Sequence, residues 1–205
     1  MDHFIKILQG YQTFRKKYAL GDQSIMQSLS DNGQSPRVMV VSCCDSRVDP
    51  ALILQCEPGD LFVVRNVANI VPPHEVDDHH HGTSAALEFG IRFLKVKHLI
   101  LLGHSQCGGI QARLSGETFD NEYITNWVSL INKDRQLPTA DDYAKQSLLQ
   151  SHQNCLTFSW IQEEVSRKNL MIHLWYFDIK AGQILTYSKT EDTFQPLDSD
   201  NLLKI

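Results

Sequence analysis

The stretch VMVVSCCDSR at residues 38–47 decides the fold. A continuous apolar run that ends in chemically reactive side chains is typical of a strand buried in a parallel sheet. Residues 98–107, HLILLGHSQC, show the same pattern and bring His104 and Cys107 to the end of a second buried strand. Sites in open α/β sheets form at the carboxyl ends of the strands. We therefore expect the two polar ends to belong to one site.

Further apolar runs predict three more strands, at 61–65, 170–177 and 184–187, the last after a tight turn and paired antiparallel. Helical spacing of apolar residues predicts helices over 83–96 and 141–168, the second with one or two breaks. Strands that alternate with helices indicate an α/β fold. We predict a mainly parallel central sheet of four strands plus an antiparallel edge strand, flanked by helices.

The first residues predict an amphipathic helix over 2–20, because apolar residues recur there at helical spacing. This helix has no obvious partner in the neighbouring sequence, so it can pack on another subunit. A chain of 205 residues suits one domain with a sizeable core. We predict a single domain over 1–205, with an N-terminal helical arm at 1–34 and an α/β core at 35–205.

Composition narrows the class of partner and compartment. Hydrophobic residues make up 42% and charged residues 21%, which is ordinary for a globular protein. The net charge of −5 argues against nucleic acid as a partner. No apolar run approaches the roughly 20 residues of a membrane span, and the first residues lack the apolar core of a signal peptide. Five cysteines without a secretion signal favour reduced thiols and a cytoplasmic protein.

Cys43, His104 and Cys107 predict a zinc site, one ion per chain, in the α/β core. Zinc prefers cysteine sulfur and histidine nitrogen in a tetrahedral shell. Three protein ligands with one further position are typical of a catalytic site. The alternatives are a structural zinc site or two unrelated packing cysteines. A structural site usually draws its ligands from close Cys-x-x-Cys knuckles, which this chain lacks.

Asp45 and Arg47 are predicted to hold and orient the hydroxide on this metal. Two thiolates make zinc a weaker Lewis acid than three imidazoles do, so hydroxide needs help in being held and oriented. If the segment is extended, Cys43, Asp45 and Arg47 point to one side. Arg47 keeps the carboxylate ionised. Asp45 can then accept a hydrogen bond from zinc-bound hydroxide or ligate zinc directly.

Four segments together resemble the β-class carbonic anhydrases: 43–48, 57–69, 82–89 and 103–109. The resemblance covers nearly the whole chain after about residue 35. It implies a zinc lyase, carbonate dehydratase, that catalyses reversible hydration of carbon dioxide to bicarbonate and a proton through zinc-bound hydroxide.

The resemblance also implies roles for individual residues. Cys43, His104 and Cys107 would bind zinc. Asp45 and Arg47 would form the catalytic dyad, with Asp45 also able to swing onto the metal.

Two substrate contacts and an assembly are also implied by the resemblance. Glu57 stands where plant-type members have a Gln that contacts substrate, and Gly108 directly follows a zinc ligand. Members of the family are dimers or larger assemblies with active sites near the subunit interface. We therefore expect a homodimer or a higher homo-oligomer such as a tetramer, in which the N-terminal helix embraces a neighbour.

Several alternatives stay open. A related zinc hydrolase acting on carbon disulfide or carbonyl sulfide would use the same scaffold. A non-catalytic zinc-binding or thiol-sensing protein would have a closed site. Cys44 is either a packing thiol or a redox-active one. The triplet at 79–81 is a solvated loop or, because imidazole titrates near neutral pH, a proton shuttle. A nucleotide-binding protein is excluded, since no glycine-rich phosphate loop follows the first strand.

Overall fold

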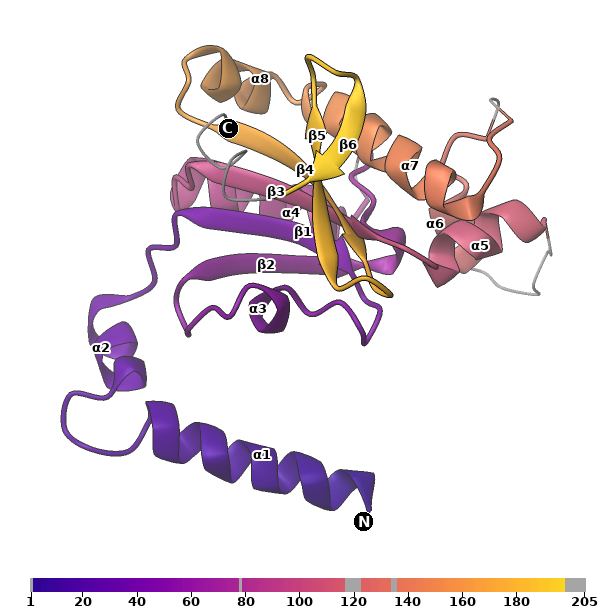
Figure 1. Ribbon diagram of the computed structural model, residues 1–205. Coiled ribbons are helices and arrows are strands. Elements are labelled where there is room, and N and C mark those ends of the chain that lie inside the picture. Colours follow the sequence, from indigo (N-terminus) through magenta and orange to yellow (C-terminus); the bar gives the residue numbers. More distant parts are fainter. Residues whose placement is uncertain (1, 78, 117–122, 134–135, 198–205) are drawn as a thin grey trace.

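The computed structural model describes residues 2–77, 79–116, 123–133 and 136–197. Its centre is one six-stranded sheet in the order β2-β1-β3-β4-β5-β6. The first four strands of that order run parallel, and β5 and β6 are antiparallel additions at one edge (Figure 1). The bounds are β1 (Val38–Cys43), β2 (Leu61–Asn66), β3 (His98–His104), β4 (Met171–Asp178), β5 (Gln183–Ser188) and β6 (Thr193–Pro196).

This sheet confirms the predicted four parallel strands and the antiparallel strand that follows them. β6 was not expected from the sequence. It ends in Pro196 and has only four residues, which is too short a run to predict a strand. They form a strand because β5 pairs with them, from Leu185 opposite Pro196 to Ser188 opposite Thr193. A strand defined by its partner in this way leaves little signal in the sequence.

Helices α4 to α8 pack on one face of the sheet and close the larger core. That core takes alternate residues from the strands, such as Met39 and Leu101, and joins them to Leu87 of α4 and Leu148 of α7. The helices are α1 (His3–Tyr18), α2 (Ile25–Asn32), α3 (Pro50–Ile53), α4 (Gly82–Glu88), α5 (Gly108–Ser115), α6 (Ile124–Val128), α7 (Ala140–Cys155) and α8 (Ser159–Ser166), with short turns η1 (Val67–Asn69) and η2 (Phe89–Phe93).

Two predicted helices are interrupted. The helix expected at 83–96 is α4 followed by a single π-helical segment, η2. Within η2, a Cβ added to Gly90 would lie 2.6 Å from the sulfur of Met39, so the backbone approaches the sheet closely there. The helix expected at 141–168 is α7 and α8, separated by a break at 156–158. In the described part of the chain, no helix is long and apolar enough to cross a bilayer.

The N-terminal helix α1 lies apart from the sheet, as Figure 1 shows. It begins at its N-cap Asp2, whose carboxylate accepts a hydrogen bond from the Phe4 amide, 3.0 Å away. None of its residues is buried. The side chains of Phe4, Ile7 and Tyr11 are 64%, 66% and 60% exposed. The predicted amphipathic helix is therefore present, with its apolar face uncovered in the single chain.

The strand register brings the two polar ends together. Cys43 is the last residue of β1, and His104 is the last residue of β3. These strands are neighbours, and Ser42 pairs with Leu102. Cys43 and His104 therefore leave the sheet side by side at its carboxyl edge.

Candidate metal centre

Three buried side chains converge at this edge: Cys43, His104 and Cys107. One ligand atom from each lies within 4.8 Å of the others, and the two sulfurs are 3.9 Å apart. The His104 Nδ1 atom lies 2.8 Å from the Ser105 carbonyl oxygen, which can only accept, so Nδ1–H is the donor. This leaves Nε2 as a buried lone pair with no hydrogen-bond partner. A buried, unpartnered imidazole nitrogen beside two sulfurs is what a metal ligand requires.

Of the two cysteines, Cys43 loses its proton easily and Cys107 keeps the proton that the two sulfurs share. The Sγ–Sγ hydrogen bond lowers the pKa of Cys43 to about 4. The same contact, together with burial, raises the pKa of Cys107, because the second thiol must remain protonated to donate. Thiolate ligands are the form that binds metal. Two soft sulfurs and one imidazole nitrogen fit zinc better than magnesium or calcium, which prefer oxygen.

An arginine of β2, Arg65, fixes the loop that follows Cys43. The Arg65 guanidinium donates to the Cys43 carbonyl oxygen at 2.9 Å and to the Asp45 carbonyl oxygen at 2.8 Å. Its third contact, at 2.8 Å, is with the Asp49 carboxylate, which also caps α3. Arg65 therefore contacts three residues of the segment 43–49. Its position shows that it braces the turn between Cys43 and α3.

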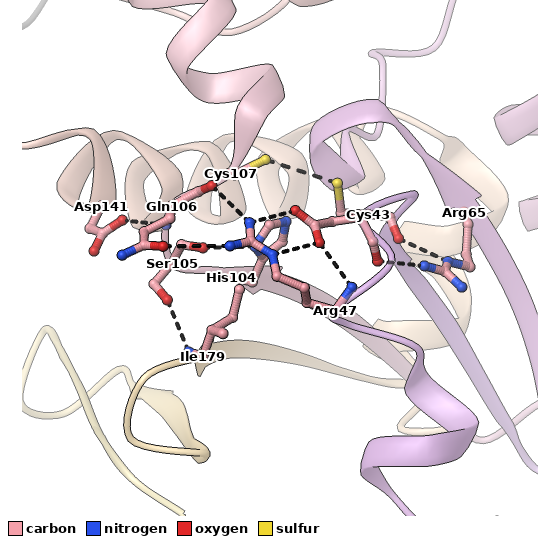
Figure 2. Close-up of polar contacts among 10 residues, drawn as sticks. Cys43, Arg47, Arg65, His104, Ser105, Gln106, Cys107, Asp141 and Ile179 are labelled. Carbon is pink, nitrogen blue, oxygen red and sulfur yellow. Dashed lines mark hydrogen bonds and ion pairs between the residues drawn. The ribbon is translucent and has the colours of Figure 1, made fainter. Parts of the chain in front are cut away.

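Asp45 and Arg47 form a two-point ion pair, and Figure 2 shows Arg47 beside Cys43 and His104. Arg47 Nε lies 2.9 Å from one carboxylate oxygen of Asp45, and Nη2 lies 2.7 Å from the other. These hydrogen bonds hold the pKa of Asp45 well below its usual range. The segment is not extended, because β1 ends at Cys43 and the Val48 amide donates to the Asp45 carbonyl oxygen in a turn. The Asp45 carboxylate is not among the three ligand groups that converge.

The loop between His104 and Cys107 is tied to β4, to the turn that follows β4, and to α7. The Ser105 amide donates to Phe177 of β4, and the Ser105 hydroxyl accepts from the Ile179 amide at 2.9 Å. Gln106 has a φ of 55°, in the left-handed region, and its amide donates to the Asp141 carboxylate at 2.9 Å. These contacts explain how the loop keeps its shape. Sequence reasoning missed Ser105, Gln106 and Asp141, because no local pattern links them to their partners.

Glycine is required at one of the two positions after Cys107. A Cβ added to Gly109 would lie 2.7 Å from Val67 Cγ1 and 2.9 Å from Ala68 Cβ. A Cβ added to Gly108 would have no neighbour within 4 Å, and Gly108 is exposed. The Gly-Gly pair therefore serves the close approach of α5 to η1 through Gly109, while Gly108 lies open beside Cys107.

The remaining candidates lie outside the converged group. Glu57 is partly exposed and forms an ion pair with Lys17 of α1 at 3.1 Å. Cys44 is exposed rather than packed in this chain, with its amide bonded to the Asn66 carbonyl oxygen. Within the triplet, His81 contacts Asp77 at 2.7 Å.

Comparisons with known proteins agree with this geometry. Residues 38–184 match the family model described as carbonic anhydrase. The chain is 35% identical over 190 residues to β carbonic anhydrase 5, chloroplastic, of Arabidopsis thaliana, which covers 86% of this chain and 62% of that protein. It is 32% identical over 196 residues to a carbonic anhydrase of Synechocystis, covering 89% of this chain and 70% of that one. The chain thus spans less than two thirds of the Arabidopsis relative.

Solved structures that resemble this chain belong to the same family. The β-carbonic anhydrase CcaA superposes with a TM-score of 0.84 at 30% identity, covering 95% of this chain and 100% of that chain. A structure from Sordaria macrospora, described as a tetrameric β-carbonic anhydrase, gives a TM-score of 0.77 at 26% identity, covering 91% and 97%. Together with the position of Cys43, His104 and Cys107 at the carboxyl edge of the sheet, these matches mean that the chain belongs to the β-class carbonic anhydrase family.

Proposed function

We propose that this chain is a zinc-dependent carbonic anhydrase that converts carbon dioxide and water to bicarbonate and a proton, reversibly. The observation that carries the proposal is the buried group of Cys43, His104 and Cys107 next to the Asp45–Arg47 ion pair. The family membership and the names of the relatives support it.

The chain's own residues define the roles. Cys43, His104 and Cys107 would hold zinc, which when bound supplies a Lewis acid that lowers the pKa of water. Asp45 stays ionised because Arg47 donates to both of its oxygens, so it can accept a hydrogen bond from the reacting water. Arg47 sets the direction of that acceptor. The arrangement orients a nucleophile beside a small substrate rather than binding a large one.

We assign Glu57 and Gly108 as substrate contacts and Asp45 as an additional, exchangeable metal ligand. Gly108 is exposed directly beside Cys107, which suits a small molecule approaching the metal. Glu57 forms an ion pair with Lys17 in the 1–34 arm, so the position of the Glu57 carboxylate depends on where α1 lies. These roles rest on the resemblance and on proximity in the chain.

We also propose that each chain binds one zinc and that the protein is a homo-oligomer. In this assembly, α1 of the 1–34 arm covers the 35–205 core of a neighbouring chain. The uncovered apolar face of α1 supports this assembly, and the Sordaria relative is described as tetrameric. The five cysteines are free thiols, which supports a reducing compartment such as the cytoplasm.

A substrate panel tests the reaction. Stopped-flow hydration of carbon dioxide is measured with a pH indicator at two pH values, on protein with its zinc content counted. Carbonyl sulfide and carbon disulfide are offered to the same preparation. Fast hydration and slow turnover of the sulfur substrates are expected. Turnover of the sulfur substrates alone would assign a related hydrolase, and full zinc with no turnover of any substrate would indicate a non-catalytic protein.

A further inference from the structure

The Arg47 guanidinium is held from two sides. On one side it meets both oxygens of Asp45. On the other, Nη2 lies 3.3 Å from the backbone carbonyl oxygen of Gln106 and Nη1 lies 3.5 Å from the Gln106 side-chain oxygen. Figure 2 shows Arg47 and Gln106 facing each other across the site. The direction of the Asp45–Arg47 pair therefore depends on where Gln106 points its carbonyl.

Gln106 does not take this conformation unaided. Its φ of 55° lies in the left-handed region, which residues other than glycine rarely adopt. Such a conformation persists when surrounding contacts enforce it. The contact on the Gln106 amide comes from the Asp141 carboxylate, at 2.9 Å. A hydrogen bond from an amide to an ionised carboxylate is stronger than one between neutral groups.

The Asp141 carboxylate is not used to cap α7, because Thr139 and Asp142 form the capping box there. Thr139 is the N-cap of α7, and the Asp142 carboxylate completes the capping box with the Thr139 amide at 3.1 Å. Asp141 sits in the same first turn, but its carboxylate leaves the helix and reaches Gln106. The Asp141 carboxylate is also close enough to the Tyr176 hydroxyl to act on it electrostatically, and Tyr176 is 3% exposed. Burial and then the charge of Asp141 raise the pKa of that tyrosine, as expected for close neighbours.

We propose that Asp141 is a positioning residue for the reaction: by holding the Gln106 peptide in its left-handed conformation, it aims the Gln106 carbonyl at Arg47 and so fixes the Asp45–Arg47 pair. Asp141 is not one of the three residues of the converged group, and it hydrogen-bonds to Gln106, which lies between His104 and Cys107. A helix 35 residues further along the chain thereby sets the geometry of the dyad. The proposal rests on the carbon dioxide hydration proposed above.

Three single variants separate positioning from general effects. Asp141→Ala removes the acceptor. Asp141→Asn keeps an oxygen that can accept from the Gln106 amide. Asp142→Ala is the matched control, because it removes the same charge from the same helical turn and breaks the capping box without a contact to Gln106. Should Asp141→Ala fail to fold, Asp141→Ser replaces it, since serine suits a helix start but is too short to reach the amide.

Two measurements are made on each zinc-loaded variant. We expect Asp141→Ala to lower kcat about 10- to 100-fold, the usual effect of a small displacement of a catalytic group. Zinc content should be unchanged, Asp141→Asn should recover most of the rate, and Asp142→Ala should lower Tm but keep the rate. Hydrogen exchange of the Gln106 amide should speed up in Asp141→Ala and stay protected in Asp142→Ala.

A double variant tests the route of the effect. Because Asp141 acts through Arg47, Asp141→Ala should cost little further rate on an Arg47→Ala background. The proposal would be overturned if Asp141→Ala kept the wild-type kcat or lost its zinc. It would also be overturned if Asp142→Ala lost as much rate as Asp141→Ala, or if Asp141→Ala lowered the rate by its full factor on the Arg47→Ala background. If the wild-type protein hydrates no carbon dioxide, the proposed reaction fails instead, and unchanged Gln106 exchange in Asp141→Ala would separately disprove the contact.

Discussion

The carboxyl edge of the sheet and the N-terminal helix α1 are opposite kinds of surface on one chain. At the sheet edge, Cys43 and Cys107 are buried, and Arg65 and Asp141 fix the loops around them. Along α1, no residue is buried, and large apolar side chains face solvent. The first region has its candidate metal-binding groups in place within a single chain. The second leaves apolar area exposed that a partner surface would cover.

The largest effect is expected from the ligands at the sheet edge. Cys43→Ala or His104→Ala should abolish zinc binding and hydration, because two ligands cannot hold the metal in a tetrahedral shell. Zinc content by elemental analysis and stopped-flow rates check this. Cys44→Ala is the matched control: its side chain is exposed beside Cys43, so zinc and rate should stay as in the wild type. Retention of one zinc per chain in Cys43→Ala would contradict the assignment.

Arg47→Ala should separate catalysis from metal binding. Loss of the two hydrogen bonds to Asp45 leaves its carboxylate unoriented, and we expect the rate to fall about 10²- to 10³-fold, as for loss of one oriented donor. Most of the zinc should remain bound. Arg47→Lys should recover little, because lysine cannot reproduce the planar two-point contact. Arg92→Ala, which removes an exposed arginine paired with Glu88, is the control. Full activity in Arg47→Ala would show that the pair has no catalytic role.

Changes on α1 should act on assembly and leave metal binding intact. Replacing Phe4, Ile7 and Tyr11 by serine removes apolar groups, each worth about 1.5–3 kcal/mol when buried against a partner. The assembly should shift to smaller species in sedimentation, while zinc content stays at one per chain. Gln9→Ser, a polar change on the same helix, should leave the mass unchanged. A wild-type protein that sediments as a monomer at micromolar concentration would disprove the assembly.

The smallest effect concerns stability on the other face of the sheet. His173 lies 3.0 Å from His98, and burial, then the charge of His98, lowers its pKa from 6.5 to about 4. The unfolded chain binds a proton there between these values and the folded chain does not, so stability should fall as pH drops from 6.5 to 4. The expected change is about 1 kcal/mol, reduced because the ring is only partly buried.

Urea unfolding at several pH values measures that slope. His173→Gln should make it shallower, whereas His80→Gln, in the exposed triplet, should leave it as in the wild type. An identical slope in wild type and His173→Gln would show that this imidazole does not link pH to stability.

The sequence predicts what depends on local pattern. Apolar runs define the parallel strands, and parallel strands bring their carboxyl ends together, so Cys43, His104 and Cys107 were predicted as one group. The closeness of Asp45 and Arg47 follows from their separation of two residues, although a turn rather than a strand produces it.

Features that depend on packing were not predicted. The Gln106–Asp141 contact needs α7 to lie on β3, and no spacing rule encodes that. The π-helical segment η2 arises where Gly90 meets the sulfur of Met39, and β6 exists because β5 pairs with it. The exposure of Cys44 likewise depends on how the chain turns after β1.

The most direct test of the account is a zinc titration of metal-free protein followed by its hydration rate. If Cys43, His104 and Cys107 form the catalytic metal site, the rate should rise in proportion to added zinc and level off at one zinc per chain. The Asp45–Arg47 pair then acts on that one metal. A rate that is absent at full zinc loading, or that needs no zinc, would contradict the central claim.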